Sequence, residues 1–147
     1  MKAILVDIDG TLADLAHRLH YIQAESSKDK NWPAFFDACS DDAPIHITIE
    51  AVRAMASTFE VVFVTGRPDS HEDHTRAWLD RHVALVGPLY MRKAGDYRED
   101  RVVKRELLAL IREHGYEPVI AIDDRRQVVD MWREEGLICL QCAAGEY

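Results

Sequence analysis

Short apolar runs alternate along the chain with stretches in which apolar residues recur every three or four positions. The runs have the length and composition of buried strands: Lys2–Asp7, Glu60–Thr65, Pro88–Met91, Pro118–Asp123 and Leu137–Gln141. The stretches between them have a helical period: Ile49–Ser57, Ser70–His82, Val102–His114 and Arg125–Glu135. Strands that alternate with helices predict a parallel sheet with right-handed crossovers. We therefore expect an α/β fold, a Rossmann-like parallel five-stranded sheet flanked by helices.

The segment after the first predicted strand breaks this alternation. No strand is predicted from Leu12 to Ile47. A helix is predicted around Asp14–Ala24, and a second helical piece over Trp32–Cys39, with a polar break between them. Two short helices inserted at this point would lie over the carboxyl end of the first strand. We interpret residues 12–47 as a small helical cap within a single domain that spans residues 1–147.

The cap carries three aromatic residues, Trp32, Phe35 and Phe36. Aromatic side chains are usually core residues, so the commoner role would be to pack the cap against the body. The other interpretation is that they shape the entrance to a site beneath the cap.

Composition narrows the class of protein. The formal net charge of −8 disfavours wide non-specific binding to nucleic acid or to an anionic membrane. Apolar runs such as Val61–Val64 are far too short to span a bilayer. Three cysteines, an odd number, in a chain that shows no secretory leader favour reduced thiols. We therefore expect a cytoplasmic protein that does not bind membranes, and an anionic ligand would need a local basic patch.

Two carboxylates mark the end of the first predicted strand, in the run Asp7-Ile8-Asp9-Gly10-Thr11. Strand alternation points Asp7 and Asp9 the same way, and Gly10 allows a sharp turn. Carboxylates this close raise each other's pKa unless a cation intervenes. The pattern suits one carboxylate that binds metal and attacks, and a second that transfers protons.

Polar residues also follow three other predicted strands. Thr65-Gly66-Arg67 offers a hydroxyl, backbone N–H groups and a guanidinium to an anion. Asp123-Asp124 supplies hard oxygen ligands for Mg²⁺. Lys104 begins the helix after the third strand, and Asp100 lies one helical turn earlier, where it can hold the ammonium group. Because ligands of parallel sheets bind at the carboxyl ends of the strands, we expect these groups to meet.

Taken singly, each motif has a structural explanation, as a turn or a helix cap. Their order along the chain, D-x-D-G-T, T-G-R, K and D-D, resembles that of the haloacid-dehalogenase-type phosphatase superfamily over essentially the whole chain. The C-terminal third is similar to the 3'-phosphatase domain of phage polynucleotide kinase-phosphatases. The segments that carry this resemblance are Ala94–Asp100, Val102–Lys104, Ala121–Arg125 and Gln127–Arg133.

The resemblance implies an enzyme, a Mg²⁺-dependent hydrolase that acts on phosphomonoesters through an aspartyl phosphate. The implied catalytic residues are Asp7, Asp9, Thr65 and Lys104, and the implied metal ligands are Asp7, Asp9 through its backbone carbonyl, Asp123 and Asp124. The implied substrate-binding residues are Arg18, Gly66, Arg67 and Asp100. The implied role is nucleic acid repair at 3'-phosphate ends.

The substrate would be a phosphorylated nucleotide or a single-stranded polynucleotide end. Residues 92–105 contain six cationic and three anionic side chains, a local positive surplus that suits such an anion. The kinase motif G-x-x-x-x-G-K-[ST] does not occur in the sequence, so a separate kinase or ligase is a possible partner. The oligomeric state stays open.

Three alternatives remain. A 5'(3')-mononucleotidase would share the core and differ in the cap. A receiver-like domain would need an acceptor carboxylate at the end of the third strand, where the sequence reads Tyr90-Met91-Arg92-Lys93. A non-catalytic phosphate-binding module would have lost the nucleophile or the lysine, and the sequence keeps both.

Overall fold

The computed structural model describes residues 1–145, with only the backbone of Ser27. The predicted α/β fold is confirmed. One parallel sheet has the strand order β5-β4-β1-β6-β7. Its strands are β1 (Lys2–Val6), β4 (Glu60–Pro68), β5 (Leu89–Arg92), β6 (Glu117–Asp123) and β7 (Ile138–Gln141).

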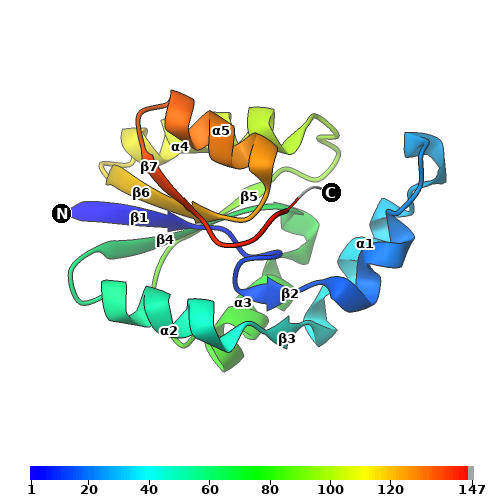
Figure 1. The fold of residues 1–147 in the computed structure, drawn as a ribbon, viewed down its shortest axis with the longest axis horizontal. Helices are drawn as coiled ribbons and strands as arrows, with labels where there is room; N and C mark the ends of the chain where they lie inside the picture. The colour runs from blue at the N-terminus through cyan, green and yellow to red at the C-terminus, as the bar shows by residue number, and fades with distance from the viewer. Residues whose placement is uncertain (146–147) are drawn as a thin grey trace.

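Helices cover both faces of the sheet, as Figure 1 shows. One face carries α4 and α5, and the other carries α2 and α3. Their bounds are α2 (His46–Met55), α3 (Glu72–His82, after the short 3-10 turn Asp69–His71), α4 (Asp100–Glu113) and α5 (Arg126–Glu134). The predicted helices agree with these bounds to within a few residues, the usual uncertainty at helix ends.

Strand alternation builds a separate core on each face. Ala3 and Leu5 of β1 pack toward α4 and α5, in a cluster that includes Trp132. Ile4 and Val6 pack toward α2 and α3, in a cluster that includes Trp78. Because both faces are covered, the central strands are apolar at almost every position, which is why they read as continuous runs in the sequence.

The pairing register brings the strand ends together. Val6, the last residue of β1, pairs with Phe63 of β4 on one side and with Ile122 of β6 on the other. The residues that follow these three positions therefore emerge at the same edge of the sheet, where Figure 1 places the cap.

The cap differs from the expectation in two ways. Residues Ala13–Asp14 (β2) and Ala43–Pro44 (β3) form a short antiparallel pair where no strand was predicted, so that prediction was wrong. The first cap helix is a 3-10 helix over Ala16–Tyr21 (η1), shorter than predicted. Two further 3-10 turns, Ser27–Asp29 (η2) and Ala38–Asp41 (η3), flank the α-helix Trp32–Asp37 (α1). The β2–β3 pair joins the two ends of the cap, which fixes where the cap begins and ends.

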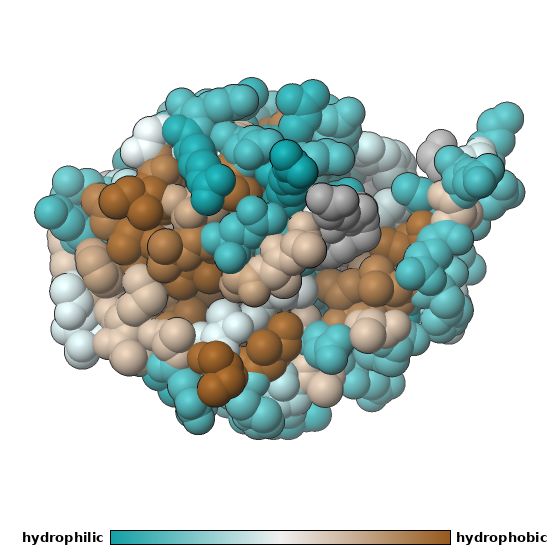
Figure 2. Space-filling view, in the orientation of Figure 1, coloured by the Kyte–Doolittle hydropathy of each residue, from teal (hydrophilic) through white to brown (hydrophobic). Residues whose placement is uncertain are grey.

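Strand β7 forms one edge of the sheet and leaves apolar side chains exposed. Ile138 and Leu140 are 66% and 48% exposed. Figure 2 shows apolar residues gathered on this side of the molecule, whereas the outer tip of the cap is hydrophilic. Across the described part of the chain, every helix is too short or too polar to cross a membrane.

Candidate active site

The loop after β1 turns sharply and holds its first carboxylate in place. Gly10 has φ +81°, a conformation that glycine adopts at little cost, and its N–H donates to the carbonyl oxygen of Ala13 at 2.8 Å. This turn brings Thr11 back over the strand end, where its hydroxyl donates to Oδ2 of Asp7 at 3.1 Å. Asp7 is thus a buried carboxylate with one oxygen fixed by its own loop.

Lys104 joins the carboxylates of two neighbouring strands. Its Nζ lies 2.8 Å from Oδ1 of Asp7 and 2.8 Å from Oδ2 of Asp123. Helix α4 begins at Asp100, so Asp100 lies one turn before Lys104, with its Oδ2 3.6 Å from Nζ. Burial lowers the pKa of Lys104, but Asp100, Asp123 and Asp7 together outweigh it and raise the pKa well above its ordinary value. The lysine is therefore a fixed positive charge at neutral pH.

Three carboxylates form the one group of this kind among the described residues that could hold a metal ion. Asp7, Asp123 and Asp124 each offer an oxygen, and these atoms lie within 4.8 Å of one another. Burial, followed by the charge of Asp123, raises the pKa of Asp7 well above its ordinary value, and Lys104 opposes this only in part. Clustered carboxylate oxygens are the donors that Mg²⁺ prefers, so the residues present fit the cation that the sequence implies.

The second carboxylate of the loop, Asp9, faces two arginines instead of the metal group. Oδ1 of Asp9 accepts hydrogen bonds from Nη2 of Arg18 and Nη2 of Arg67, both at 2.6 Å. Burial opposes ionisation, but Arg67 and Arg18 outweigh it and lower the pKa of Asp9 to about 2. Asp9 is therefore ionised at neutral pH in this state, and the two arginines oppose its protonation.

Both arginines are fully buried in the described structure, and their guanidinium groups meet carboxylates of the protein. Arg18 comes from the 3-10 helix η1 of the cap, and Arg67 from the end of β4. The predicted role of these two residues in substrate binding stays a prediction, and the contacts observed position Asp9.

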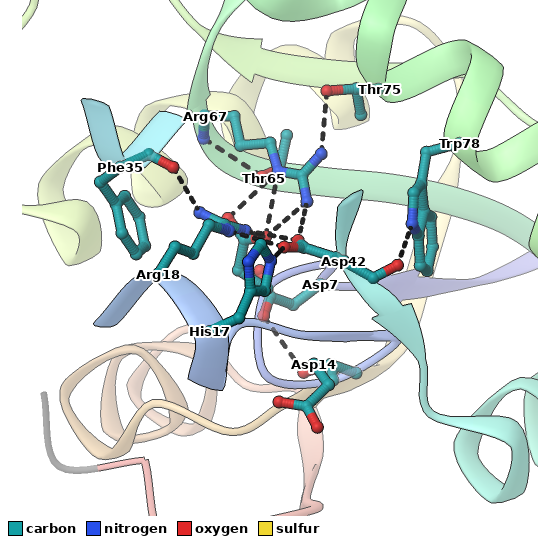
Figure 3. A network of polar contacts seen from close by, with 12 residues as sticks. Asp7, Asp14, His17, Arg18, Phe35, Asp42, Thr65, Arg67, Thr75 and Trp78 are labelled. Carbon is teal, nitrogen blue, oxygen red and sulfur yellow. Dashed lines mark hydrogen bonds and ion pairs between the residues drawn. The ribbon is translucent and has the colours of Figure 1, made fainter. Parts of the chain in front are cut away.

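Asp42 completes this network, and sequence reasoning missed it. Its carboxylate accepts from Nε and Nη2 of Arg18 at 2.7 and 2.6 Å and from Nη2 of Arg67 at 3.1 Å, and Nε2 of His17 lies 2.7 Å away. Figure 3 shows Asp42 between Arg18, Arg67 and His17. Its backbone carbonyl accepts from the indole N–H of Trp78 at 2.9 Å, so the end of the cap is tied to α3. Two buried guanidinium groups need two carboxylates to balance their charge. That need was the one signal that could have pointed to Asp42.

We expect Asp42→Asn to weaken both stability and turnover. A hydrogen bond to a charged group contributes about 1.5–3 kcal/mol to stability. The amide of asparagine is neutral and has a single accepting oxygen, so it cannot replace the hydrogen bonds that the carboxylate accepts from both arginines. Arg18 and Arg67 would then hold Asp9 less firmly, which should lower kcat by up to roughly a hundredfold. Chemical denaturation and steady-state kinetics measure the two effects.

Asp37→Asn is the matched control, because Asp37 is an exposed cap carboxylate that pairs with His71 at 2.9 Å. Wild-type kcat and stability in Asp42→Asn would contradict the role given to this network.

Of the remaining predicted residues, Gly66 and Asp100 line the same cavity as the metal group, and Thr65 precedes Gly66 in β4. Thr65 is buried, and its Oγ1 accepts from the N–H of Arg67 at 3.1 Å, within the last part of β4, where the pairing register with β5 is irregular. Gly66 lies against Asp100 so closely that a Cβ would stand 2.2 Å from Oδ1 of that carboxylate. No other residue fits there without displacing Asp100. The Asp100 carboxylate also faces two arginines, Nη2 of Arg92 at 3.5 Å and Nη1 of Arg125 at 3.8 Å.

A cavity between the cap and the body opens onto these groups. It holds about 500 Å³ of empty space, part of it open to solvent. The body contributes acids and cations to its lining, and the cap contributes apolar side chains. The lining residues used below are Asp7, Arg92 and Arg125 from the body and Ile22, Trp32, Phe35 and Phe36 from the cap. The aromatic residues of the cap therefore pack mainly with one another and with other cap residues, and they also line the cavity.

A family model and curated proteins match this chain. The model described as the polynucleotide kinase PNKP phosphatase domain matches residues 1–147. The chain is 28% identical over 138 residues to a protein of Autographa californica nuclear polyhedrosis virus whose name combines polynucleotide kinase and RNA ligase. That match covers 90% of this chain and 18% of the viral protein, so the chain spans under a fifth of this relative.

Solved structures give a similar result. A chain of the Pnkp1/Rnl/Hen1 complex superimposes with a TM-score of 0.80 at 27% identity, over 99% of this chain and 47% of that chain. A haloacid-dehalogenase family enzyme from Bacteroides thetaiotaomicron, solved with magnesium and inorganic phosphate, has a TM-score of 0.58 at 13% identity. It covers 100% of this chain and 96% of the bacterial enzyme, and at this identity the likeness shows the fold alone.

Proposed function

Since the chain belongs to the family of the polynucleotide kinase PNKP phosphatase domain, we propose that it is a Mg²⁺-dependent phosphomonoesterase that removes 3'-phosphates from polynucleotide ends or nucleosides. The broader statement, a haloacid-dehalogenase-like phosphatase domain, follows from the family itself. The cation, the covalent intermediate and the substrate are the parts proposed here.

One observation carries the chemistry: a buried carboxylate, Asp7, lies within reach of both a lysine and two further acids. Lys104 contacts Asp7 at 2.8 Å, and Asp123 and Asp124 complete a group of oxygens within 4.8 Å. Four charged groups in so small a buried space are costly unless they bind something. A divalent cation with a phosphate dianion satisfies both the acids and the lysine.

Asp7 is the proposed nucleophile. Its carboxylate attacks phosphorus in line with the leaving oxygen and forms an acyl phosphate, which water then hydrolyses to restore Asp7 and release inorganic phosphate. Lys104 and Thr65 are proposed to hold the equatorial oxygens of the phosphoryl group, where charge is carried through the transition state. Mg²⁺, held by Asp7, Asp123, Asp124 and the backbone carbonyl of Asp9, would supply charge neutralisation and orientation.

Asp9 is proposed to transfer the protons. In the observed state it is ionised, with a pKa of about 2, so it has the form that a general base needs, but this low pKa makes it a weak base for the attacking water. Protonation of the leaving alkoxide requires Asp9 first to take up a proton, and the two arginines disfavour that. A phosphate dianion bound beside Asp9 acts in the opposite direction, because a neighbouring negative charge raises the pKa of a carboxyl group.

The preference for a nucleic acid end rests on cations beside the metal group. Arg92 and Arg125 line the cavity at the side of Asp100, where they can meet the phosphate of an adjoining nucleotide. The description of the family model and the name of the viral relative both include polynucleotide kinase, which supports nucleic acid repair as the setting. A kinase or ligase is proposed as a partner on the same ground.

We expect release of phosphate from 3'-phosphorylated oligonucleotides and nucleoside 3'-phosphates, and little from 5'-phosphorylated oligonucleotides. The 3' preference is inferred from the resemblance to 3'-phosphatase domains, whereas Arg92 and Arg125 could meet the next phosphate of a strand at either end. The measurement is kcat/KM on a panel that also contains 5'-mononucleotides and an internally linked oligonucleotide, each assayed with Mg²⁺ and with EDTA. Turnover should disappear with EDTA.

A strong preference for 5'-mononucleotides would replace this proposal with the mononucleotidase alternative. Full activity in EDTA would instead remove Mg²⁺ from the mechanism and leave the phosphatase assignment intact. Absence of turnover on every phosphomonoester, together with tight phosphate binding, would indicate a non-catalytic module.

A further inference from the structure

The cap presents a wall of aromatic rings to the same cavity that contains the nucleophile. The cap contributes Trp32, Phe35, Phe36 and Ile22 to the lining, and the body contributes Asp7. A phosphate that contacts Asp7 therefore lies in the same cavity as these rings, at the end of the sheet where Figure 1 places the cap.

The wall is ordered by contacts among its own rings. Trp32 stacks on Phe36, with 5.8 Å between ring centroids and 23° between planes, and meets Phe35 edge-on at 5.6 Å. Phe35 is fully packed at 3% exposure, and the guanidinium of Arg18 lies 4.2 Å from its ring centroid. The network that holds Asp9 therefore also fixes the base of the wall.

Trp32 and Phe36 are not needed to close the core of the cap. That core consists of Leu15, Ile22 and Phe35, and the two other rings pack against it while remaining only half-buried. Part of their apolar surface is thus left to the cavity. A flat apolar surface of this kind, beside a phosphate-binding group, suits a planar ring joined to the phosphate through a sugar.

We propose that this wall, and Trp32 above all, binds the nucleobase of the nucleotide that carries the scissile phosphate. This inference rests on the proposed function and names the part of the substrate that the cap recognises. Stacking is indifferent to base identity, because every base has a π-face. The enzyme then distinguishes a nucleotide end from a small phosphomonoester without reading the sequence of the strand.

The test compares two single-stranded oligonucleotides with a 3'-phosphate, identical except that one has an abasic terminal sugar. Base–aromatic stacking corresponds to about a 5- to 150-fold change per base, so wild-type kcat/KM should fall by roughly that factor on the abasic end. Trp32→Ala should lose a similar factor on the end that carries a base. The ratio between the two substrates should therefore approach one in Trp32→Ala, and Trp32→Phe should keep most of it.

Tyr97→Ala is the matched control, because Tyr97 is 90% exposed and is not among the residues that line the cavity. Its ratio of kcat/KM between the two substrates should equal that of the wild type.

A second readout avoids dependence on turnover. Trp78 and Trp132 are each 1% exposed, but the indole N–H of Trp132 donates to Oδ2 of Asp123 at 3.2 Å, so its fluorescence can also respond to binding at the metal group. The contribution of Trp32 is therefore the part of the fluorescence change that is present when Asp7→Asn is titrated with the base-bearing oligonucleotide and absent from Asp7→Asn/Trp32→Phe. That part should disappear when the abasic oligonucleotide is used.

Equal kcat/KM of the wild type on the abasic and base-bearing ends would overturn the stacking proposal while leaving the 3'-phosphatase function in place. Equal losses on both substrates in Trp32→Ala would also overturn it, and would show that the wall only holds the cap together. Hydrolysis of 5'-mononucleotides with neither 3'-phosphate end attacked would instead overturn the proposed function, and this inference with it.

Discussion

Asp7→Asn should abolish turnover, with kcat lowered on the order of ten-thousandfold or more, as is typical when a nucleophile is removed. The amide is a poor nucleophile and a weaker ligand for a divalent cation. The fold should persist, because the amide is nearly the same size and Thr11 can still donate its hydrogen bond to the side-chain oxygen. Acid-quenched protein analysed by mass spectrometry should carry a phosphoryl group in the wild type and none in the variant.

Stability gives an independent check on this variant. Burial and the charges of Asp123 and Asp124 disfavour the ionised form of Asp7, so a neutral side chain relieves repulsion even as Lys104 loses one partner. We expect the melting temperature of Asp7→Asn in the absence of metal to equal or exceed that of the wild type.

Asp14→Asn is the matched control, since Asp14 is an exposed acid of the same loop and caps the N–H of Ala16 at 2.9 Å, which an amide oxygen can also do. Turnover by Asp7→Asn at the wild-type rate would show that the mechanism is wrong.

Lys104→Met is expected to lower both rate and stability. Loss of one electrostatic contact in a transition state costs about 10²–10³ in kcat. The same change leaves Asp7 and Asp123 buried without the ammonium that lies 2.8 Å from each, and breaking a buried ion pair costs about 3–5 kcal/mol. Arg101→Met, which removes an exposed cation one turn earlier on α4, is the matched control. A loss in Arg101→Met as large as that in Lys104→Met would mean that general charge, and not this contact, is responsible.

The stability lost in Lys104→Met should depend on pH in a defined direction. In the wild type Lys104 opposes the rise in the pKa of Asp7, so without it the pKa of Asp7 rises further. A folded-state pKa above the unfolded value favours the fold at low pH and costs stability as pH rises through it. The difference in unfolding free energy between wild type and variant should therefore shrink on acidification in the absence of metal. A difference that grew as pH fell would contradict the ion pair.

The sequence alone determined the sheet and the groups at its carboxyl ends. Runs such as Lys2–Asp7 are apolar at nearly every position because both faces of a central strand are covered, and that pattern is local. The position of Asp7, Thr65 and Asp123 relative to one another then follows from strand direction, since parallel strands bring their carboxyl ends to one edge. Lys104 was found in the same way, one helical turn after Asp100.

The cap was predicted as a segment but not in its details. A two-residue pair such as β2–β3 leaves no periodic pattern, and a 3-10 helix lacks the 3.6-residue period by which an α-helix is recognised. The aromatic residues of the cap were expected to pack the cap against the body or to shape the entrance to the site, and they pack mainly within the cap. Their exposure to the cavity depends on where the cap lies over the sheet.

Only the tertiary structure decided how the second carboxylate is held. Asp9, Arg18, Asp42 and Arg67 come from the loop after β1, from the cap and from the end of β4, and they are separated by 9 to 58 residues along the chain where they contact. No local spacing encodes such contacts. These contacts follow from the cost of burying two guanidinium groups, which partner carboxylates offset. Asp42 became recognisable as such a partner only once the fold had brought both arginines to it.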